Sequence, residues 1–240
     1  MTFKAVISQD RLKSIIDAVS HITDDAKLQI SSDGLKIEAI DPANVAMVFL
    51  KASSEAFSFF QATEMTIALD IHKLSTLASG KEDVSLELIE DSHKLNIKVG
   101  RTKYTMSLLD PTAIKATPRL PQLDLPAQVA IQGSDLREAM QSATKVSDHV
   151  VVEQSDEEFK ISAKGDIDSV EMPFALSELT NIRQGMSRAL FSLDYLDDIS
   201  KAAKSSEVTI ETGIDYPMKL SFNLGNVYIQ YLLAPRIEQE

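Results

Sequence analysis

The sequence predicts an α+β fold made of two tandem, similar domains, each an antiparallel sheet with two helices. Apolar residues recur at helical spacing in four places, and alternate with polar residues through most of the remaining chain. The same order of elements starts again after 124 residues of the 240-residue chain. A repeat of this length indicates a duplicated domain rather than a solenoid, with helices on one face of each sheet.

The first half opens with an alternating strand at Phe3–Ile7, followed by a helix over about residues 9–20 with Leu12 and Ile16 on its apolar face. A second helix is expected near 71–80, with Asp70 as its N-cap. The other strands are expected at Lys27–Ser31, Leu35–Ile40, Val45–Lys51, Ala56–Phe60, 66–69, Val84–Ile89, Lys94–Val99 and Thr102–Leu109.

The second half follows at one offset, which carries Leu12 onto Leu136 and Asp70 onto Asp194. The same offset carries Tyr104 onto Tyr228, and predicts helices near 135–146 and 195–204. We therefore expect an N-terminal domain at 1–117, a connector at 118–126 and a C-terminal domain at 127–240.

A proline-rich stretch at 110–126 separates the two halves and holds four of the eight prolines. Proline removes a backbone donor and favours extended neighbours, so neither a helix nor a central strand is expected there. A plain linker would explain the prolines. The stretch also carries the spaced apolar residues Ile114, Leu120, Leu123 and Leu125, which a purely passive linker would not need.

The net charge of −12 argues, taken alone, against binding to nucleic acid. In the four windows that cover the helices, however, eight basic residues balance eight acidic ones, so the whole excess lies elsewhere. Ordinary compensation of helix dipoles is one explanation. The other is a helical face kept less negative than the rest, which suits weak contact with phosphates. The basic residues of these windows are Arg11, Lys13, Lys73, Lys81, Arg137, Lys145, Lys201 and Lys204.

No catalytic or metal-binding pattern stands out, and we expect neither an enzyme nor a cofactor. The chain has no cysteine, and its four histidines lack the spacing of a metal or catalytic motif. Asp70 and Asp194 are better explained by helix capping than as paired carboxylates. Asp41 with Glu38 suggests a metal pair only weakly, because an aspartate before Pro42 is typical of a turn.

Two sheet edges are expected to be open in a single copy. If the last strand, Tyr228–Leu233, pairs with Val45–Leu50, the equivalent strands Tyr104–Leu109 and Ser169–Phe174 lack partners. Joining them between copies is a head-to-tail contact, which closes into a ring or runs on as a filament. The residues expected at this subunit interface are Tyr104, Met106, Leu108, Ser169, Glu171 and Pro173.

The sequence also lacks a signal peptide and an apolar run of the roughly 20 residues that span a membrane. We expect a cytoplasmic protein without membrane contact.

Several motifs, in order, resemble the sliding clamps of the proliferating cell nuclear antigen (PCNA) family, most closely the archaeal type. They are Ser32-Asp33-Gly34-Leu35, Ala39-Ile40-Asp41-Pro42-Ala43-Asn44-Val45-Ala46-Met47, Asp110-Pro111-Thr112-Ala113-Ile114, Pro118-Arg119-Leu120-Pro121, Ala163-Lys164-Gly165-Asp166 and Leu232-Leu233-Ala234-Pro235-Arg236-Ile237-Glu238. The resemblance covers essentially the whole chain.

The resemblance implies the DNA clamp fold and a homotrimeric ring that encircles duplex DNA without reading its sequence. Such a processivity factor serves DNA replication and DNA repair: it tethers DNA polymerase, the flap endonuclease and DNA ligase through PIP-box peptides, and a clamp loader opens it. By position, Lys13, Lys73, Lys145, Lys201 and Lys204 would face the DNA, and we group Arg11, Lys81 and Arg137 of the same helices with them. Ser20, Ser79 and Gln141 stand where the family commonly has basic residues, which implies a weaker hold on DNA.

The resemblance also implies a groove for partner peptides. Its residues would be Ile40, Asn44, Val45, Met47, Leu120, Pro121, Pro217, Ala234, Pro235 and Arg236. Two alternatives stay open from the sequence. One is a subunit of a heterotrimeric, checkpoint-type clamp, and the much weaker one is an aspartate-based, metal-dependent hydrolase.

Overall fold

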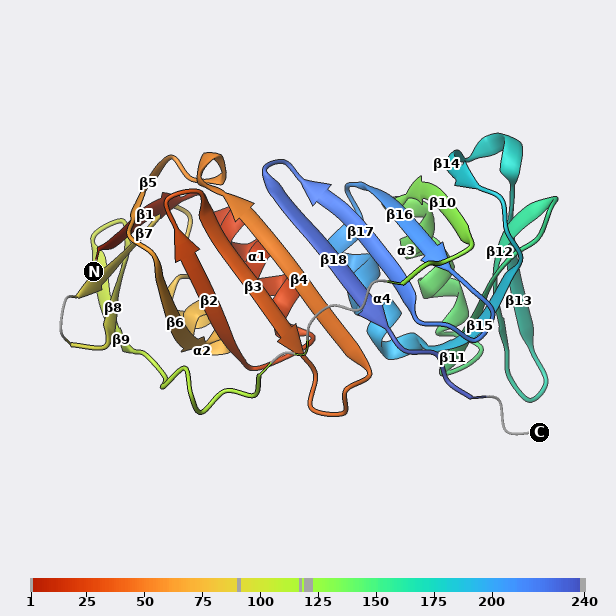
Figure 1. The fold of residues 1–240 in the computed structure, drawn as a ribbon, viewed down its shortest axis with the longest axis horizontal. Coiled ribbons are helices and arrows are strands. Elements are labelled where there is room, and N and C mark those ends of the chain that lie inside the picture. The colour runs from red at the N-terminus through yellow and green to blue at the C-terminus, as the bar shows by residue number, and fades with distance from the viewer. Residues whose placement is uncertain (1, 90–91, 117, 119–122, 238–240) are drawn as a thin grey trace. The chain divides into compact units, whose positions relative to one another are not determined.

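The computed structural model describes residues 2–89, 92–116, 118 and 123–237. The chain forms two compact units. Unit 1 is Met1–Pro118 together with Leu224–Ile229, and unit 2 is Arg119–Asn223 together with Gln230–Glu240. Each unit combines antiparallel sheets with two helices, as the alternation of the sequence predicts (Figure 1).

Unit 1 contains two runs of hydrogen-bonded strands, in the orders β5-β1-β7-β8-β9 and β4-β3-β2-β6. Every strand pair registered within these runs is antiparallel. The elements are β1 (Phe3–Ile7), α1 (Gln9–Ser20), β2 (Asp25–Ser31), β3 (Gly34–Ile40), β4 (Ala46–Ser53), the 3₁₀ turn η1 (Ser54–Ala56), β5 (Phe59–Ala62), β6 (Met65–Asp70), α2 (Ile71–Leu77), β7 (Val84–Ile89), β8 (Lys94–Val99) and β9 (Thr102–Ser107).

Unit 2 repeats this plan, with strand orders β13-β12-β11-β15 and β14-β10-β16-β17-β18. Its elements are β10 (Ala127–Gln132), α3 (Gly133–Ala143), β11 (His149–Gln154), β12 (Glu158–Lys164), β13 (Ser169–Ala175), the 3₁₀ turn η2 (Leu176–Glu178), β14 (Thr180–Arg183), β15 (Ser187–Ser192), α4 (Leu193–Ala203), β16 (Glu207–Thr212), β17 (Met218–Leu224) and β18 (Val227–Leu233). The first residues of β18, Val227–Ile229, belong to unit 1.

The helices of each unit pack in a pair against one face of a sheet (Figure 1). In α1 the buried residues are Leu12, Ile15, Ile16, Ala18 and Val19, which form a single stripe at helical spacing. The opposite face of each helix stays polar and exposed. The core of each unit therefore lies between a helix pair and its sheets, and the exposed helix face is free to contact other molecules.

Several expected boundaries were wrong. The expected strand Ala56–Phe60 is instead the turn η1 followed by β5, because the Phe57 N–H donates to the Ser54 carbonyl and bends the chain. The expected strand Thr102–Leu109 stops at Ser107: the Leu108 N–H still donates to the His93 carbonyl in register with β8, but the Leu109 N–H donates to the Ala68 carbonyl of β6. Helix α2 ends at Leu77 rather than near residue 80, and α3 ends at Ala143 rather than near residue 146.

The repeat offset changes by one residue in the last hairpin of each unit. The turn glycines Gly100 and Gly225, both with positive φ (58° and 60°), are 125 residues apart. Leu95 and Leu220, which are both buried, show the same spacing. Because side chains alternate along a strand, this single residue reverses the face on which each one lies. The expected equivalence of Tyr104 with Tyr228 was therefore wrong, and Tyr104 corresponds to Ile229.

The two expected aspartate caps behave differently. Asp70 caps α2, and its Oδ1 accepts a hydrogen bond of 2.7 Å from the Lys73 N–H. Asp194 lies within the first turn of α4, whose N-cap is Ser192 and has no side-chain cap bond. The expectation that Asp194 is a cap was wrong. Its carboxylate still lies at the positive end of the helix dipole.

Candidate DNA and partner surfaces

Five lysines lie on the helices or just beyond their ends: Lys13 is on α1 and Lys73 on α2, Lys81 and Lys145 follow the ends of α2 and α3, and Lys204 is the C-cap of α4. Lys13, Lys73 and Lys81 of unit 1, and Lys145 and Lys204 of unit 2, are exposed. Within the described residues none of the five forms an ion pair. An ammonium group without a carboxylate partner is available to a phosphate, and its contact is reduced by added salt.

Lys201 differs, because two carboxylates of its own helix hold it. Its Nζ lies 2.8 Å from Asp197 Oδ2 and 2.7 Å from Asp198 Oδ1. The hydrogen bonds to Asp197 and Asp198 raise the pKa of Lys201 above its ordinary value. Its charge is permanent, but it is already compensated within α4, so Lys201 offers less to a phosphate than the free lysines.

Arg137 of α3 is directed toward α4 rather than toward solvent. Its Nη1 donates to the Asp197 carbonyl and to Ser200 Oγ, at 3.1 Å each, and forms an ion pair with the Asp197 carboxylate. Only 16% of its side chain is exposed. Burial raises the pKa of Asp197, but hydrogen bonds from Lys201 and Arg137 outweigh it and leave that pKa below its ordinary value. Arg137 therefore fastens the two helices together.

The side chain of Arg11 in unit 1 is also held by a hydrogen bond within the fold. It is half-buried, and its Nη1 donates a hydrogen bond of 3.1 Å to the Ala56 carbonyl. Of the eight basic residues expected to face DNA, the five free lysines are thus the most available, Lys201 is compensated, and Arg11 and Arg137 serve the fold.

A tight turn built on Asp41 positions the expected groove residues of unit 1. The side chain of Asp41 is buried, and its carboxylate accepts hydrogen bonds from the N–H groups of Ala43 (3.0 Å), Val45 (2.7 Å) and Ala46 (2.8 Å). Asn44 has positive φ (60°), a conformation that asparagine tolerates better than most residues. Asp41 is therefore a turn residue, as expected.

The turn leaves three apolar residues partly exposed: Ile40, Val45 and Met47 are each half-buried. Ile40 also lines a pocket of about 360 Å³, together with Pro42, with Leu109 and, from the proline-rich stretch, with Ile114. The start of that stretch is held by Asp110, whose pKa is lowered by hydrogen bonds from the backbone N–H and hydroxyl of Thr112. Ile114 therefore lines a pocket in unit 1, whereas Leu120 and Pro121 lie outside the described residues.

The other expected groove residues belong to unit 2. Ala234, Pro235 and Pro217 are half-buried, and Arg236 is exposed. The Arg236 N–H donates a hydrogen bond of 2.7 Å to the Leu190 carbonyl, which attaches this part of the chain to β15.

The expected interface residues lie on two strands that end their sheets, β9 and β13. Ser169, Glu171 and Pro173 are exposed on β13, and Tyr104 is 39% exposed on β9. Met106, however, is fully buried in unit 1. The expectation that the Met106 side chain is available to a partner was therefore wrong, because it faces the core beside Leu95. Leu108 is half-buried beyond the end of β9.

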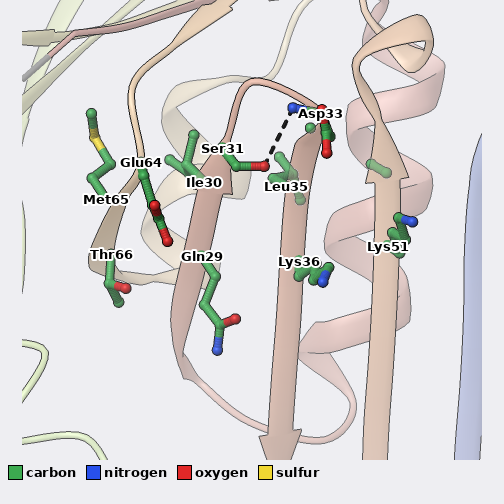
Figure 2. Close-up of a pocket in the computed structure, with 12 residues that line it drawn as sticks. Gln29, Ile30, Ser31, Asp33, Leu35, Lys36, Lys51, Glu64, Met65 and Thr66 are labelled. Carbon is green, nitrogen blue, oxygen red and sulfur yellow. Dashed lines mark hydrogen bonds between the residues drawn. The ribbon is translucent and has the colours of Figure 1, made fainter.

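A further pocket of about 390 Å³ lies on the outer face of β2, β3 and β4 (Figure 2). Figure 2 shows Gln29, Lys36 and Lys51 in a row across these strands, with a hydrogen bond from the Asp33 N–H to Ser31 Oγ at 3.3 Å. Its two lysines, Lys36 and Lys51, are balanced by the carboxylates of Asp33 and Glu64, and all four side chains are exposed. We assign no function to it.

The described part of the chain contains no group of three or more His, Cys, Asp or Glu side chains placed to hold a metal ion. Nor, within those residues, is any helix long and apolar enough to cross a membrane. His72 lies at the surface with its Nε2 3.0 Å from Asp24 Oδ1.

Sequence reasoning missed two parts of these surfaces. The link between Arg137 and Asp197 joins residues 60 positions apart, and no local pattern announces it. The pairing of Asp197 with Lys201 has the i, i+4 spacing that favours ion pairs on a helix, so that part was open to prediction.

Comparison with known proteins identifies the family to which this architecture belongs. Residues 3–107 match the family described as proliferating cell nuclear antigen, N-terminal domain, and residues 119–237 match its C-terminal domain. The chain is 52% identical to the DNA polymerase sliding clamp of Methanothrix thermoacetophila, over 99% of both chains. It is 43% identical to that of Methanosarcina barkeri, over 99% of this chain and 100% of that one. Among solved structures it matches "C-terminal region of FEN-1 bound to A. fulgidus PCNA" with a TM-score of 0.93 and 35% identity, covering 99% of this chain and 100% of that one.

Two tandem domains of this kind, each with a helix pair on antiparallel sheets, define the class of DNA clamp proteins, which are non-catalytic processivity factors. Within that class the chain belongs to the proliferating cell nuclear antigen family.

Proposed function

We propose that this chain is a DNA polymerase sliding clamp, a processivity factor that encircles duplex DNA and performs no chemistry itself. The observation that carries the proposal is the placement of free positive charge. A chain of net charge −12 exposes lysines, unpaired within the described residues, on the helices of both units or just beyond their ends, among them Lys13, Lys73 and Lys145. Sparse phosphate contacts without base readout permit sliding, because no single register on the DNA is preferred.

The assembly we propose is a homotrimeric ring, closed head to tail through β9 of one copy and β13 of the next. Both strands end their sheets within the described residues. A closed ring pairs every such edge and removes a risk of aggregation. The ring would act on nucleoid DNA in the cytoplasm.

Partners are proposed to bind as extended peptides at the apolar surface around Ile40, Val45 and Met47, with Ile114 lining the adjoining pocket. A peptide with an aromatic anchor fits such a surface. Leu120 and Pro121 of the connector, and Pro217 and Ala234–Arg236 of unit 2, are proposed as further peptide contacts. DNA polymerase, flap endonuclease, DNA ligase and a clamp loader are the proposed partners, the second because the solved relative binds the C-terminal region of FEN-1.

Loading on circular and linear DNA tests the proposal. Purified protein is loaded onto a nicked circular plasmid with a clamp loader from a related archaeon, washed at high salt, and half of the sample is then linearised. We expect retention on the circle and loss from the linear form, since topology rather than affinity holds a closed ring. Equal retention on both forms would show that the protein binds DNA without encircling it.

A heteromeric clamp subunit is the alternative for the assembly. Light scattering on the pure chain separates the two: a trimer at micromolar concentration supports the homotrimer, whereas a stable monomer favours a partner-dependent subunit.

A further inference from the structure

Two strands of this chain have an uncovered edge, although their repeat equivalents are covered. Ala46, Val48 and Leu50 of β4 are buried, whereas their equivalents on β13, Val170, Met172 and Phe174, are only half-buried. β13 ends the order β13-β12-β11-β15 and pairs, in the described structure, with β12 alone. The half-buried residues mark the place of a missing neighbour.

The covered case shows what that neighbour is. Within unit 1, the Ser53 N–H of β4 donates a hydrogen bond of 3.1 Å to the Asn226 carbonyl. The rings of Phe49 and Tyr228 are 6.3 Å apart. The strand equivalent to Val227–Leu233 is β9, whose Tyr104 is 39% exposed where Ile229 is fully buried. The strand that would cover β13 is therefore the equivalent of β18, which is β9. Because each chain has both β9 and β13, β9 of one copy can cover β13 of another.

The β9 edge is basic. Between Lys94 and Ser107 the sequence has four basic residues and no acidic one. Lys98 of β8 lies directly opposite Lys103 of β9. Like charges placed opposite each other weaken a strand pair. Neither lysine forms an ion pair within the described residues. This arrangement favours an anionic neighbour.

The β13 edge is acidic. From Asp156 to Glu178 the sequence has seven acidic residues and two basic ones. Lys160 is engaged mainly by Glu153 at 2.7 Å, while Glu171 and Glu158 lie 3.9 Å and 4.0 Å from it. The Glu171 side chain is 65% exposed. An excess of negative charge therefore remains at this edge after Lys160 has paired with its neighbouring glutamates.

The in-chain contacts also give the register of the junction. Carried over with offsets of 124 for β4 and 125 for β18, the Ser53–Asn226 contact becomes Ser177–Arg101 between copies. An antiparallel pairing through that contact sets Lys103 opposite Ala175. Ala175 is small and lies beside Glu158, so Lys103 reaches across it to that carboxylate.

A second pair follows from the same register. Ser107 comes opposite Glu171, and Ser107 itself lies beside Lys94. The small side chain of Ser107 leaves Glu171 within reach of Lys94. Both predicted ion pairs therefore cross the junction over a small residue.

We propose that the junction between copies of this chain is an electrostatic latch, in which the basic β9 edge of one copy binds the acidic β13 edge of the next. The pairs that specify it are Lys103 with Glu158 and Lys94 with Glu171. The latch rests on the proposed clamp function, because only a ring requires the junction. Since such pairs are screened by ions, salt sets how firmly the assembly stays closed.

The test measures oligomeric state by size exclusion with light scattering, from about 0.05 M to about 1 M salt. Four chains are compared: the natural one, Lys103→Glu, Glu158→Lys, and the double variant. Lys36→Glu, an exposed lysine in the middle of another sheet, is the matched control. We expect each single reversal to raise the concentration of half-dissociation at least about tenfold. The double variant should restore assembly, and the control should change nothing.

The outcomes separate the latch from the clamp function. A natural chain that dissociates as salt rises, with single variants that separate and a double variant that reassembles, supports the latch. If the ring stays assembled at every salt concentration and in both single variants, the latch proposal is wrong, but the proposed clamp function is unaffected. If both single variants dissociate and the double variant also stays dissociated, the proposed register is wrong. A natural chain that is monomeric at every salt and at tens of micromolar contradicts the homotrimer itself.

Discussion

Two cations of unit 2 converge on Asp197, which makes this residue the centre of the contact between α3 and α4. Its carboxylate binds Lys201 at 2.8 Å and forms an ion pair with Arg137, whose side chain is mostly buried. Removing the carboxylate leaves a guanidinium with neutral partners only, in a place where water reaches it poorly. Asp197 therefore contributes more to the fold than an exposed surface aspartate does.

Asp197→Asn should lower the free energy of unfolding by about 1–2 kcal/mol, the scale of a partly buried charged hydrogen bond. Urea unfolding at pH 7 measures this, with Asp194→Asn in the exposed first turn of α4 as the control. A loss no larger than that of the control would contradict the central role of Asp197.

Comparison of the natural chain with Asp197→Asn also gives a test of pH dependence. Hydrogen bonds from Lys201 and Arg137 hold the pKa of Asp197 below its ordinary value of 3.8. A lowered carboxyl pKa stabilises the fold above the unfolded-state value, and that stabilisation is lost as pH falls through the folded-state value. The difference between the natural chain and Asp197→Asn should therefore be full at pH 6 and shrink below about pH 3.8. A difference that is constant down to pH 3 would argue against an ionised Asp197.

The helix lysines are not equivalent in their availability to DNA. Lys145→Ala removes a free charge, whereas Lys201→Ala removes one that Asp197 and Asp198 already compensate. We expect Lys145→Ala to weaken binding to a short duplex and to flatten its dependence on salt by roughly one phosphate contact per site. Lys201→Ala should change both much less. Fluorescence anisotropy across a salt series measures them, and an equal effect of the two substitutions would contradict the assigned compensation.

At the scale of elements, the loop from Asp41 to Met47 is held by one buried carboxylate. Three N–H groups donate to it, including those of Val45 and Ala46. Asp41→Ala leaves these donors without their acceptor, which should weaken binding of a partner peptide by about 1–3 kcal/mol, since Val45 and Met47 lose their fixed positions. Calorimetric titration with a peptide bearing an aromatic anchor measures this.

Asp33→Ala, in the exposed turn between β2 and β3, is the matched control for the loop. Asp41→Asn keeps one acceptor oxygen and should recover part of the affinity. Natural affinity in Asp41→Ala would show that the peptide binds elsewhere.

The elements themselves were largely open to prediction. Helices α1 and α3 follow from apolar residues at helical spacing, such as Leu12 and Ile16. The strands follow from alternation that one buried face imposes. The prediction of boundaries failed where hydrogen bonds to distant residues decide them. At Leu109, for example, the N–H donates to the Ala68 carbonyl, and β9 does not continue.

The sites were predictable in type more than in detail. The basic residues of the helices could be named, but not that Arg137 is buried against Asp197, because that contact joins two helices far apart in sequence. Met106 was misplaced for a different reason. A strand alone does not reveal which face is covered, and an offset of 124 where 125 applies reverses the faces.

At the scale of the whole molecule, duplication explains both the connector and the edges. Fusing two similar units in one chain places a proline-rich segment between them and leaves one open strand of each kind, β9 and β13. The net charge of −12 lies outside the four helix windows, so the chain repels polyanions except near its free lysines.

One consequence of having both complementary edges on a single chain is sensitivity to poisoning. A copy with Glu158→Lys still offers a natural β9 edge, so it joins one neighbour and then blocks the next. In a ring of three, equal amounts of natural and altered copies leave about one assembly in eight free of altered copies, because all three positions must be filled correctly. Stimulation of a polymerase on circular DNA should fall by that steep factor rather than by half. A simple halving would mean that altered copies are excluded from mixed assemblies, and that each copy selects its neighbours before the circle closes.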